Sequence, residues 1–509
     1  MKILKLLFSR VVIVGFILFL QVAYFLILLF RLGNYSTEIH AAFTMISIVV
    51  VLYIVNKNDN PGYKLAWIVP ILAFPLFGGI LYVAMGDKKP ARKMRKKLEL
   101  VGDFTNQLLY QKPEIIHEIE EEHPQVAGQV KYLQQSVGYP VYKNTQTKYF
   151  PIGEEYYEAL LEELNQAKHF IFMEYFIVEE GAMWNNILEV LERKAKEGID
   201  VRFMYDDVGC VTLLPYQYYK QLEAKGIKSI AVNPFRPIFS VAMNNRDHRK
   251  IAVIDGHTGF TGGVNLADEY INQKVRFGHW KDTGIMLKGD AVWSMTIMFL
   301  QMWNANRPTD HDYAQYRPHV HHNEHFDGDG YVLPYGDSPL DSETTGENVY
   351  LNMINNAKKY VYVLTPYLIT DNEMMSALSL AAKRGIDVRI ITPGIPDKKI
   401  VFKLTQSYYP QLIKAGVKVY QYAPGFLHAK CVVSDDEVAT VGTINFDYRS
   451  LYLHFENGVF LYKTDSVNKV KEDVLDTISK CEEIRHGYLK HGLVRDMFRA
   501  IFRLFAPLM

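Results

Sequence analysis

Three long apolar runs fill most of the first 100 positions, and shorter apolar runs separated by helical spacing follow them. The long runs are Val11–Phe30, Ile39–Val55 and Leu65–Met85, the last broken by Pro70, Pro75 and Gly78-Gly79. At about 1.5 Å per residue, the first run can cross a hydrocarbon core of roughly 30 Å. It is too long for a secretory signal peptide, and no small-x-small cleavage site follows it. We therefore expect residues 1–100 to form a membrane leader with two or three transmembrane segments.

A basic cluster closes this leader, and its members are Lys88, Lys89, Arg92, Lys93, Arg95, Lys96 and Lys97. Positive charge beside a membrane segment favours the cytoplasmic side, and it attracts anionic headgroups. A solvated linker is the alternative. Lys2, Lys5 and Arg10 also favour an inside N-terminus, which would require an even number of spans. Either the third run is re-entrant or interfacial, or the N-terminus lies outside, and the sequence leaves the two open.

An internal repeat follows a polar connector at residues 101–130. Residues 167–172 and 198–202 are closely similar to residues 357–362 and 385–389. Each copy has an apolar run, then helical spacing, then a glycine and a second apolar run, which predicts strand, helix and strand. The repeat predicts an α/β protein with two domains, 131–315 and 331–485, joined by a linker at 316–330. Each domain should carry a mixed central sheet, and a pseudo-twofold axis should place the site at their seam.

The last segment, residues 486–509, has the pattern of an amphipathic helix. Apolar residues follow helical spacing at Val494, Met497, Phe498, Ile501, Phe502 and Phe505, and Arg495, Arg499 and Arg503 form a basic stripe. This pattern is typical of a helix in the membrane interface. A helix packed on the second domain fits it equally well.

One motif occurs once in each half of the repeat. It is His248-Arg249-Lys250 followed by Asp255, and again His428-Ala429-Lys430 followed by Asp435, so both copies are H-x-K-x4-D. After six intervening residues, a glycine (Gly262 or Gly442) opens a short turn that ends in Asn265 or Asn445. The residues after each His are mostly apolar and β-branched, which predicts a strand with His and Lys on one face. Two such hairpins, face to face, give a site with two His, two Lys and two Asn.

This residue set suits a phosphodiester. Ammonium and amide groups donate hydrogen bonds to phosphate oxygens, and two imidazoles supply a nucleophile and a general acid. A carboxylate cage for Mg²⁺ is missing from the set. The pattern therefore predicts phosphodiester transfer through a phospho-histidine, with no metal and no cofactor.

The paired motifs resemble the HKD motifs of the phospholipase D superfamily, and the chain as a whole resembles its bacterial cardiolipin synthase family. The resemblance includes the leader, the stretch from Asp327 to Asn356 and the Ala506-Pro507-Leu508 tail. It implies a multi-pass enzyme of the bacterial cell membrane with its catalytic domains on the cytoplasmic side. It also implies transfer between two phosphatidylglycerols with release of glycerol, and hydrolysis of phospholipid is the alternative.

The resemblance also suggests residue roles. The catalytic set is His248, Lys250, Asp255, His428, Lys430 and Asp435, with Asn265 and Asn445 on the phosphate. The resemblance favours His248 as nucleophile and His428 as acid and base, although the symmetry of the motifs does not decide this. The motif aspartates are generally held to be structural in this family. Asp282 and Glu456 match the acids that orient the histidines, and a surface position is the alternative for each.

Further positions are weaker candidates. Glu174-Tyr175, Asp206-Asp207 and Pro366-Tyr367 end predicted strands near the seam, and the loop from Pro234 to Asn245 is a candidate for the acceptor pocket. The linker histidines, His319, His321, His322 and His325, form a possible metal cluster, which the chemistry does not need. A net charge of zero argues against nucleic acid, 13% aromatic residues suit lipid, and three scattered cysteines suit a reducing compartment. Oligomeric state is left open.

Overall fold

The computed structural model describes residues 36–75, 92–234, 245–341, 343–488 and 492–508, with single positions at 19, 20, 23, 24, 27, 78, 79, 82 and 86. The chain divides into two compact units. One consists of Met1–Lys89, Phe235–Asn244 and Leu493–Met509, and the other of Pro90–Pro234 and Asn245–Gly492. Both α/β halves of the repeat therefore belong to one unit.

The smaller unit is helical. Its elements are α3 (Ser36–Asn56), α4 (Pro61–Ala73), α19 (Leu493–Phe505) and the 3₁₀ turn η7 (Ala506–Leu508). The C-terminal elements α19 and η7 contact α4, as α3 does, so the last segment packs on the leader. No helix in the described part of the chain has both the length and the apolar character needed to cross a membrane. The first predicted segment, Val11–Phe30, lies outside the described residues apart from five single positions.

The first α/β half is built on a mixed sheet. Among the described residues it has seven strands in the order β1-β8-β6-β5-β2-β3-β4. They are β1 (Thr145–Phe150), β2 (Phe170–Tyr175), β3 (Asp200–Asp206), β4 (Lys228–Val232), β5 (Ile251–Ile254), β6 (Thr258–Gly262) and β8 (Gly284–Gly289). β2, β3 and β4 are parallel, and the remaining pairs are antiparallel. Its helices are α9 (Gly153–Gln166), α10 (Ala182–Lys196), α11 (Asp207–Cys210) and α12 (Tyr218–Ala224).

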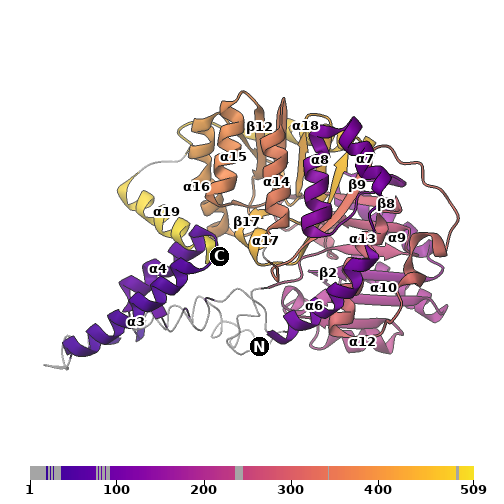
Figure 1. The fold of residues 1–509 in the computed structure, drawn as a ribbon, viewed down its shortest axis with the longest axis horizontal. Coiled ribbons are helices and arrows are strands. Elements are labelled where there is room, and N and C mark those ends of the chain that lie inside the picture. Colours follow the sequence, from indigo (N-terminus) through magenta and orange to yellow (C-terminus); the bar gives the residue numbers. More distant parts are fainter. Residues whose placement is uncertain are drawn as a thin grey trace. The chain divides into compact units, whose positions relative to one another are not determined.

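The second half repeats this sheet in the same order. Among the described residues its order is β19-β13-β12-β10-β15-β16-β18-β9, so β19 is an addition at one edge. The strands are β9 (Tyr331–Asp337), β10 (Tyr360–Leu364), β12 (Asp387–Pro393), β13 (Lys418–Tyr422), β15 (Cys431–Ser434), β16 (Val438–Gly442), β18 (Glu456–Tyr462) and β19 (Cys481–Ile484). Its helices are α14 (Thr345–Asn356), α15 (Asn372–Lys383), α16 (Lys399–Ala415), α17 (Tyr448–Tyr452) and α18 (Asp465–Ser479). Figure 1 shows α14, α15 and α16 side by side in this half. The two predicted α/β halves with mixed sheets are confirmed.

The two halves share a core. Helix α13 (Val292–Asn306) is apolar nearly all round, and it contacts strands of the first half as well as β9 of the second. Its side chains join a single buried cluster with residues of both sheets, including Phe172, Val253, Val433 and Leu461. A helix that is hydrophobic on every face is stable only when it is enclosed. This shared core fixes the two halves against each other and therefore fixes the seam where the motifs meet.

The basic cluster from Arg92 onward belongs to the larger unit. It begins helix α6 (Arg92–Thr105), which contacts α13. Two short helices follow, α7 (Pro113–Glu122) and α8 (Pro124–Lys131), each with proline in its first turn. Fixed backbone angles make proline suitable for the first turn of a helix. The predicted connector is therefore helical.

Candidate active site

Backbone pairing between the halves positions both motif histidines. The short strands β7 (His279–Lys281) and β14 (Gly425–Leu427) are parallel partners from different halves. The His428 amide donates to the Lys281 carbonyl at 2.7 Å. On the other side of the pseudo-twofold axis, the His248 amide donates to the Phe455 carbonyl at 2.9 Å. Each histidine is thus held by the segment of the opposite half that carries an orienting acid.

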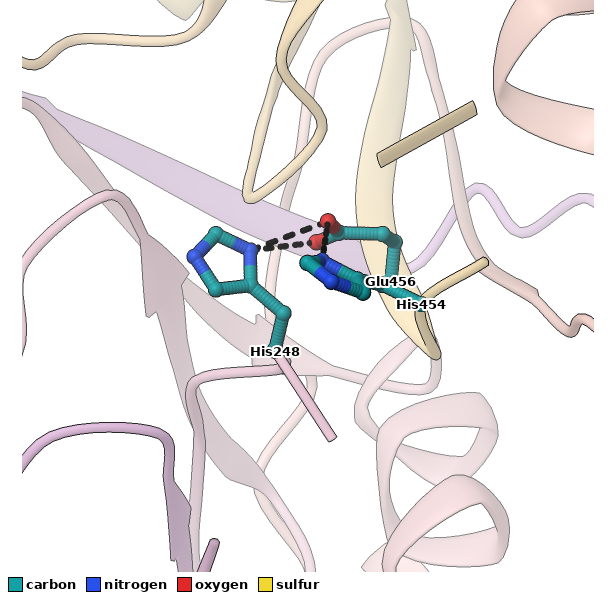
Figure 2. A group of neighbouring side chains, drawn as sticks. All are labelled: His248, His454 and Glu456. Atoms are coloured by element: carbon teal, nitrogen blue, oxygen red, sulfur yellow. Dashed lines mark hydrogen bonds and ion pairs between the residues drawn. The ribbon is translucent and has the colours of Figure 1, made fainter. Parts of the chain in front are cut away.

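The side-chain pairs cross the seam in the same way. His248 Nδ1 lies 2.9 Å from both carboxylate oxygens of Glu456, and His428 Nδ1 lies 2.6 Å from Asp282 Oδ2. Figure 2 shows the first of these pairs. A carboxylate beside Nδ1 accepts a hydrogen bond from the Nδ1–H group, which keeps the ring proton on Nδ1 and leaves Nε2 with its lone pair. Both imidazoles are therefore held in the tautomer that exposes a basic Nε2.

Burial sets the charge state of these pairs. It lowers the pKa of His248 to about 3, although Glu456 opposes the shift, and it lowers the pKa of His428 to about 4, with the nearby Lys430 charge adding to the effect. Burial alone would raise the carboxyl pKa values. The pKa of Glu456 is nevertheless lowered by His248, and that of Asp282 by His428 and Lys430. At neutral pH the resting site has two neutral imidazoles and two carboxylates.

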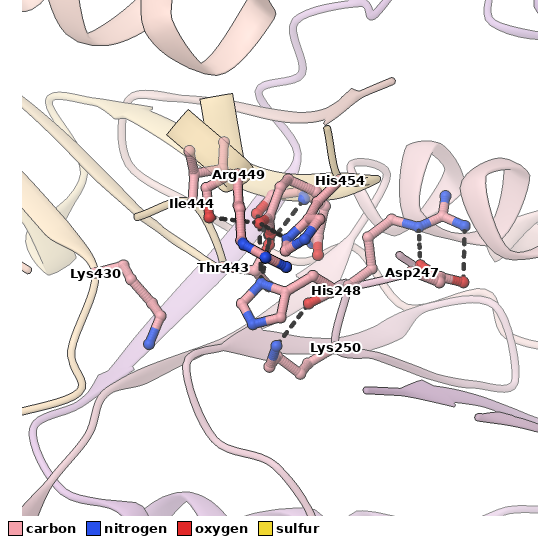
Figure 3. Close-up of polar contacts among 12 residues, drawn as sticks. Asp247, His248, Lys250, Lys430, Thr443, Ile444, Arg449 and His454 are labelled. Carbon is pink, nitrogen blue, oxygen red and sulfur yellow. Dashed lines mark hydrogen bonds and ion pairs between the residues drawn. The ribbon is translucent and has the colours of Figure 1, made fainter. Parts of the chain in front are cut away.

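The motif lysines add positive charge close to both carboxylates. Lys250 Nζ donates to the His248 carbonyl at 2.6 Å, and Lys430 Nζ donates to the His428 carbonyl. Burial lowers the pKa of Lys250 to about 7, and the Lys430 charge adds to this. Burial also lowers the pKa of Lys430 to about 8, against the pull of both carboxylates. Two buried ammonium groups that repel each other favour binding of an anion. Figure 3 shows both lysines beside His248.

The His-x-Lys residues differ from prediction in one respect. They precede β5 and β15 instead of lying within them. Side chains two residues apart still lie on one face, because Arg249 donates a hydrogen bond to Asp247 at 3.0 Å. That pair and Glu174, which accepts from Arg249 at 2.5 Å, are buried.

The two asparagines are bonded differently. Asn265 Oδ1 accepts from the Ile177 amide at 3.0 Å, and its Nδ2 donates to the Tyr270 hydroxyl at 2.8 Å. Asn445 Oδ1 is buried without a hydrogen-bond partner among the described residues. Asn265 therefore has one Nδ2 hydrogen left for a ligand, and Asn445 is the less constrained of the two.

The motif aspartates anchor backbone instead of lining the site. Asp255 accepts from the amides of Lys168, His169 and Phe170 at 2.8–2.9 Å. Asp435 does the same for residues 358–360 at the start of β10. Both aspartates have left-handed backbones, with φ of 51° and 57°. Each carboxylate thus ties the turn after the motif strand to the start of the neighbouring antiparallel strand, β2 or β10.

The surroundings of the two acids differ, and sequence reasoning missed this. Glu456 accepts from the Thr443 hydroxyl and from the Ser450 hydroxyl at 2.7 Å, and His454 Nδ1 lies 3.6 Å away. Asp282 accepts from the Thr283 amide at 2.9 Å. At the position equivalent to Thr443, the first half has Gly263, where an added Cβ would lie 1.9 Å from an Asp282 oxygen. Alignment of Trp280-Lys281-Asp282 with His454-Phe455-Glu456 places His454 two residues before an orienting acid. This alignment could have identified His454 from the sequence.

The weaker candidates lie mostly away from the histidines. Tyr175 belongs to the core of the first half. Asp206 caps the N-terminus of α11 and accepts a hydrogen bond from the Asp247 amide at 3.2 Å. Asp207 begins α11, and Tyr367, which follows Pro366, donates to Asp397 at 2.6 Å. The predicted acceptor loop falls on residues 235–244, outside the described residues.

Side chains with metal-ligand atoms gather at a different place from the linker histidines. The linker histidines pair with other groups: His321 stacks on His169 at 4.0 Å, and His319 contacts Asp290 at 2.5 Å. Within the described residues, the one group of three with metal-ligand atoms inside 4.8 Å is His248, His454 and Glu456.

Comparisons with known proteins agree with this geometry. Residues 160–277 and 350–477 match the family model described as "Cardiolipin synthase, PLD-like domain", and residues 44–86 match "Phospholipase_D-nuclease N-terminal". The chain is 36% identical to cardiolipin synthase 2 of Bacillus anthracis, over 92% of this chain and 91% of that protein. It is 35% identical to a cardiolipin synthase of Alkalihalophilus pseudofirmus, over 92% and 93%. The crystal structure of phosphatidylserine synthase from Haemophilus influenzae covers 72% of this chain and 95% of that one, at 14% identity and a TM-score of 0.55, which shows a shared fold.

Proposed function

This chain belongs to the phospholipase D-like cardiolipin synthase family, and we propose that it joins two phosphatidylglycerols into cardiolipin and releases glycerol. The observation that carries the proposal is the crossed pair of His–carboxylate contacts at the seam. It provides one activated imidazole from each half, with two ammonium groups close to both carboxylates. That set suits an in-line exchange of two alcohols on one phosphorus.

In the first half-reaction, His248 Nε2 attacks the phosphorus of the first phosphatidylglycerol. The bond from phosphorus to the glycerol oxygen breaks, and His428 gives that oxygen a proton. His428 must first be protonated, which its lowered pKa disfavours in the resting site. An anionic phosphate beside it stabilises the imidazolium and raises that pKa on binding. Lys250 and Lys430 stabilise the charge on the non-bridging oxygens.

In the second half-reaction, neutral His428 takes a proton from the hydroxyl of the second phosphatidylglycerol. The oxygen forms a bond to phosphorus while the bond from phosphorus to His248 breaks. Cardiolipin leaves, and both imidazoles return to their starting states. Water in place of the lipid hydroxyl would give phosphatidic acid, so exclusion of water decides between synthase and lipase.

The unequal surroundings of the acids support His248 as the nucleophile. Glu456 has two hydroxyl donors besides His248, and such donors make a carboxylate less basic. A less basic partner stabilises the positive phospho-imidazole without removing its Nδ1 proton. The 2.6 Å contact between His428 and Asp282 suits a histidine that gains and loses a proton in each cycle.

We place the enzyme at the bacterial cell membrane with its catalytic halves on the cytoplasmic side. The described part of α3 exposes Met45, Ile46, Val49 and Leu52, each more than half accessible. Such a contiguous apolar surface favours contact with lipid. The proposal of several membrane spans rests on the three apolar runs of the leader, and the cytoplasmic placement rests on the basic cluster.

The deciding experiment uses the purified full chain in mixed micelles with phosphatidylglycerol labelled in its headgroup glycerol. We expect cardiolipin and one free labelled glycerol per cardiolipin, and no product from His248→Asn or His428→Asn. Phosphatidic acid as the main phospholipid product would show a hydrolase instead.

A further inference from the structure

His454 is a buried imidazole with no assigned task. Its side chain is 9% exposed, and neither ring nitrogen has a hydrogen-bond partner among the described residues. An unsatisfied buried polar group in a folded protein needs an explanation, such as an ion or a water molecule. The equivalent position of the first half is Trp280, so the pseudo-twofold relation of the halves does not require a histidine here.

The atoms around His454 have the spacing of a metal centre. Its Nδ1 lies 3.6 Å from Glu456 Oε1, and His248 Nδ1 lies 2.9 Å from the same carboxylate. All three ligand atoms fall within 4.8 Å of one another. Ligands bound tetrahedrally at 2.0–2.1 Å are separated by about 3.3 Å, and the two nitrogen-to-carboxylate distances bracket this value. Figure 2 shows both imidazoles directed at the carboxylate.

We propose that His248, His454 and Glu456 form a binding site for one zinc-like divalent ion, and that the bound ion blocks transfer. Two imidazoles and one carboxylate suit Zn²⁺ or Co²⁺ better than Mg²⁺ or Ca²⁺, which prefer oxygen ligands. Water would complete the coordination. Thr443 and Ser450, which already bond to Glu456, would hold the carboxylate in place.

The block follows from the tautomer of His248. A metal ion on Nδ1 needs the lone pair of that nitrogen, so the ring proton moves to Nε2. Nε2 then has no lone pair with which to attack phosphorus, and no proton is gained or lost overall. The His428 side lacks a third ligand at the equivalent position, because Trp280 has no metal-binding nitrogen.

Metal binding can be tested without substrate. Metal-free full-length protein in detergent is titrated with Co²⁺ and followed by visible absorption, and with Zn²⁺ by calorimetry. We expect one ion per chain in the wild type. His454→Asn should weaken binding by more than the roughly 10- to 100-fold that loss of an outer-shell partner costs. The matched control is the double variant His321→Asn/His322→Asn in the linker, which should bind the ion as the wild type does.

Equal binding by wild type and His454→Asn, or loss of binding in the linker control, would overturn the site. If His454→Asn does not fold, X-ray absorption of zinc-loaded wild type decides: two imidazoles and one carboxylate support the site, and any other ligand set refutes it. The block itself rests on the proposed function. Zn²⁺ should inhibit cardiolipin formation in the wild type and far less in His454→Asn. Bound zinc without inhibition would refute the block alone, and absence of cardiolipin in any sample would refute the proposed function while leaving the binding result intact.

Discussion

Replacing Glu456 with glutamine should slow phosphatidyl transfer about a thousandfold without unfolding the protein. Glu456 is fully buried and faces neutral His248 in the resting site, so its charge meets a positive ring only once phosphorus is bound. At a charge separation of about 4 Å and an effective dielectric constant of about 20, that attraction is worth about 4 kcal/mol. A loss of this size corresponds to roughly 10³ in rate. Glutamine keeps the shape of the side chain and its amide oxygen can still accept a hydrogen bond from Nδ1–H. The loss of rate therefore reports the loss of the negative charge alone.

The assay is kcat/KM for cardiolipin formation in mixed micelles, with circular dichroism and thermal unfolding as checks of the fold. Asp310→Asn is the matched control, because it removes another buried carboxylate, one paired with Arg202. We expect the control to lose stability and to keep its kcat per folded molecule. If Glu456→Gln retains a rate within about tenfold of wild type, the charge of Glu456 does not support the transition state and the electrostatic argument is wrong.

Three further predictions concern the other charged groups. Asp255→Asn should lower the free energy of unfolding by about 2–3 kcal/mol in denaturant titrations, because charged hydrogen bonds to three backbone amides are weakened. A kcat loss as large as that of His248→Asn would contradict this structural role. The wild-type kcat/KM should fall as pH rises through about 7 to 8, where Lys250 and Lys430 lose their protons. Lys250→Arg should move this fall to higher pH, since guanidinium stays charged, and an unchanged profile would exclude the lysine as its source. Chelators should not lower activity, and a loss that one particular divalent ion restores would show that the chemistry requires a metal.

Much of the fold could be predicted because local pattern and repeat agree. The similar segments around Phe170 and Tyr360 become β2 and β10, equivalent strands in two sheets of the same order. The resemblance suggested Asp282 and Glu456 as the acids that orient the histidines, but which acid faces which histidine across the seam could not be predicted. It depends on how two separate sheets dock, and that docking is set by the packing of α13 against both halves.

The finer features of the site depend on three-dimensional detail that spacing does not carry. The pattern placed His248 and Lys250 in a strand, whereas the strand begins at Ile251 and the His248 amide bonds instead to the Phe455 carbonyl of the other half. Thr443 donates a hydrogen bond to Glu456, whereas Gly263 leaves room for Asp282. This difference can be interpreted only once the position of the neighbouring acid is known. Both differences arise from contacts between residues far apart in the sequence.

The central claim is that one histidine from each half acts in turn on the same phosphorus, and trapping of the intermediate tests it most directly. His428→Ala is mixed with labelled phosphatidylglycerol, quenched at neutral to alkaline pH because phospho-histidine is acid-labile, and mapped by mass spectrometry. The account predicts a phosphatidyl group on His248 in this variant and no adduct in His248→Ala. Label on His428 in His248→Ala, with none on His248 in His428→Ala, would reverse the two roles, and label on neither would contradict a covalent intermediate.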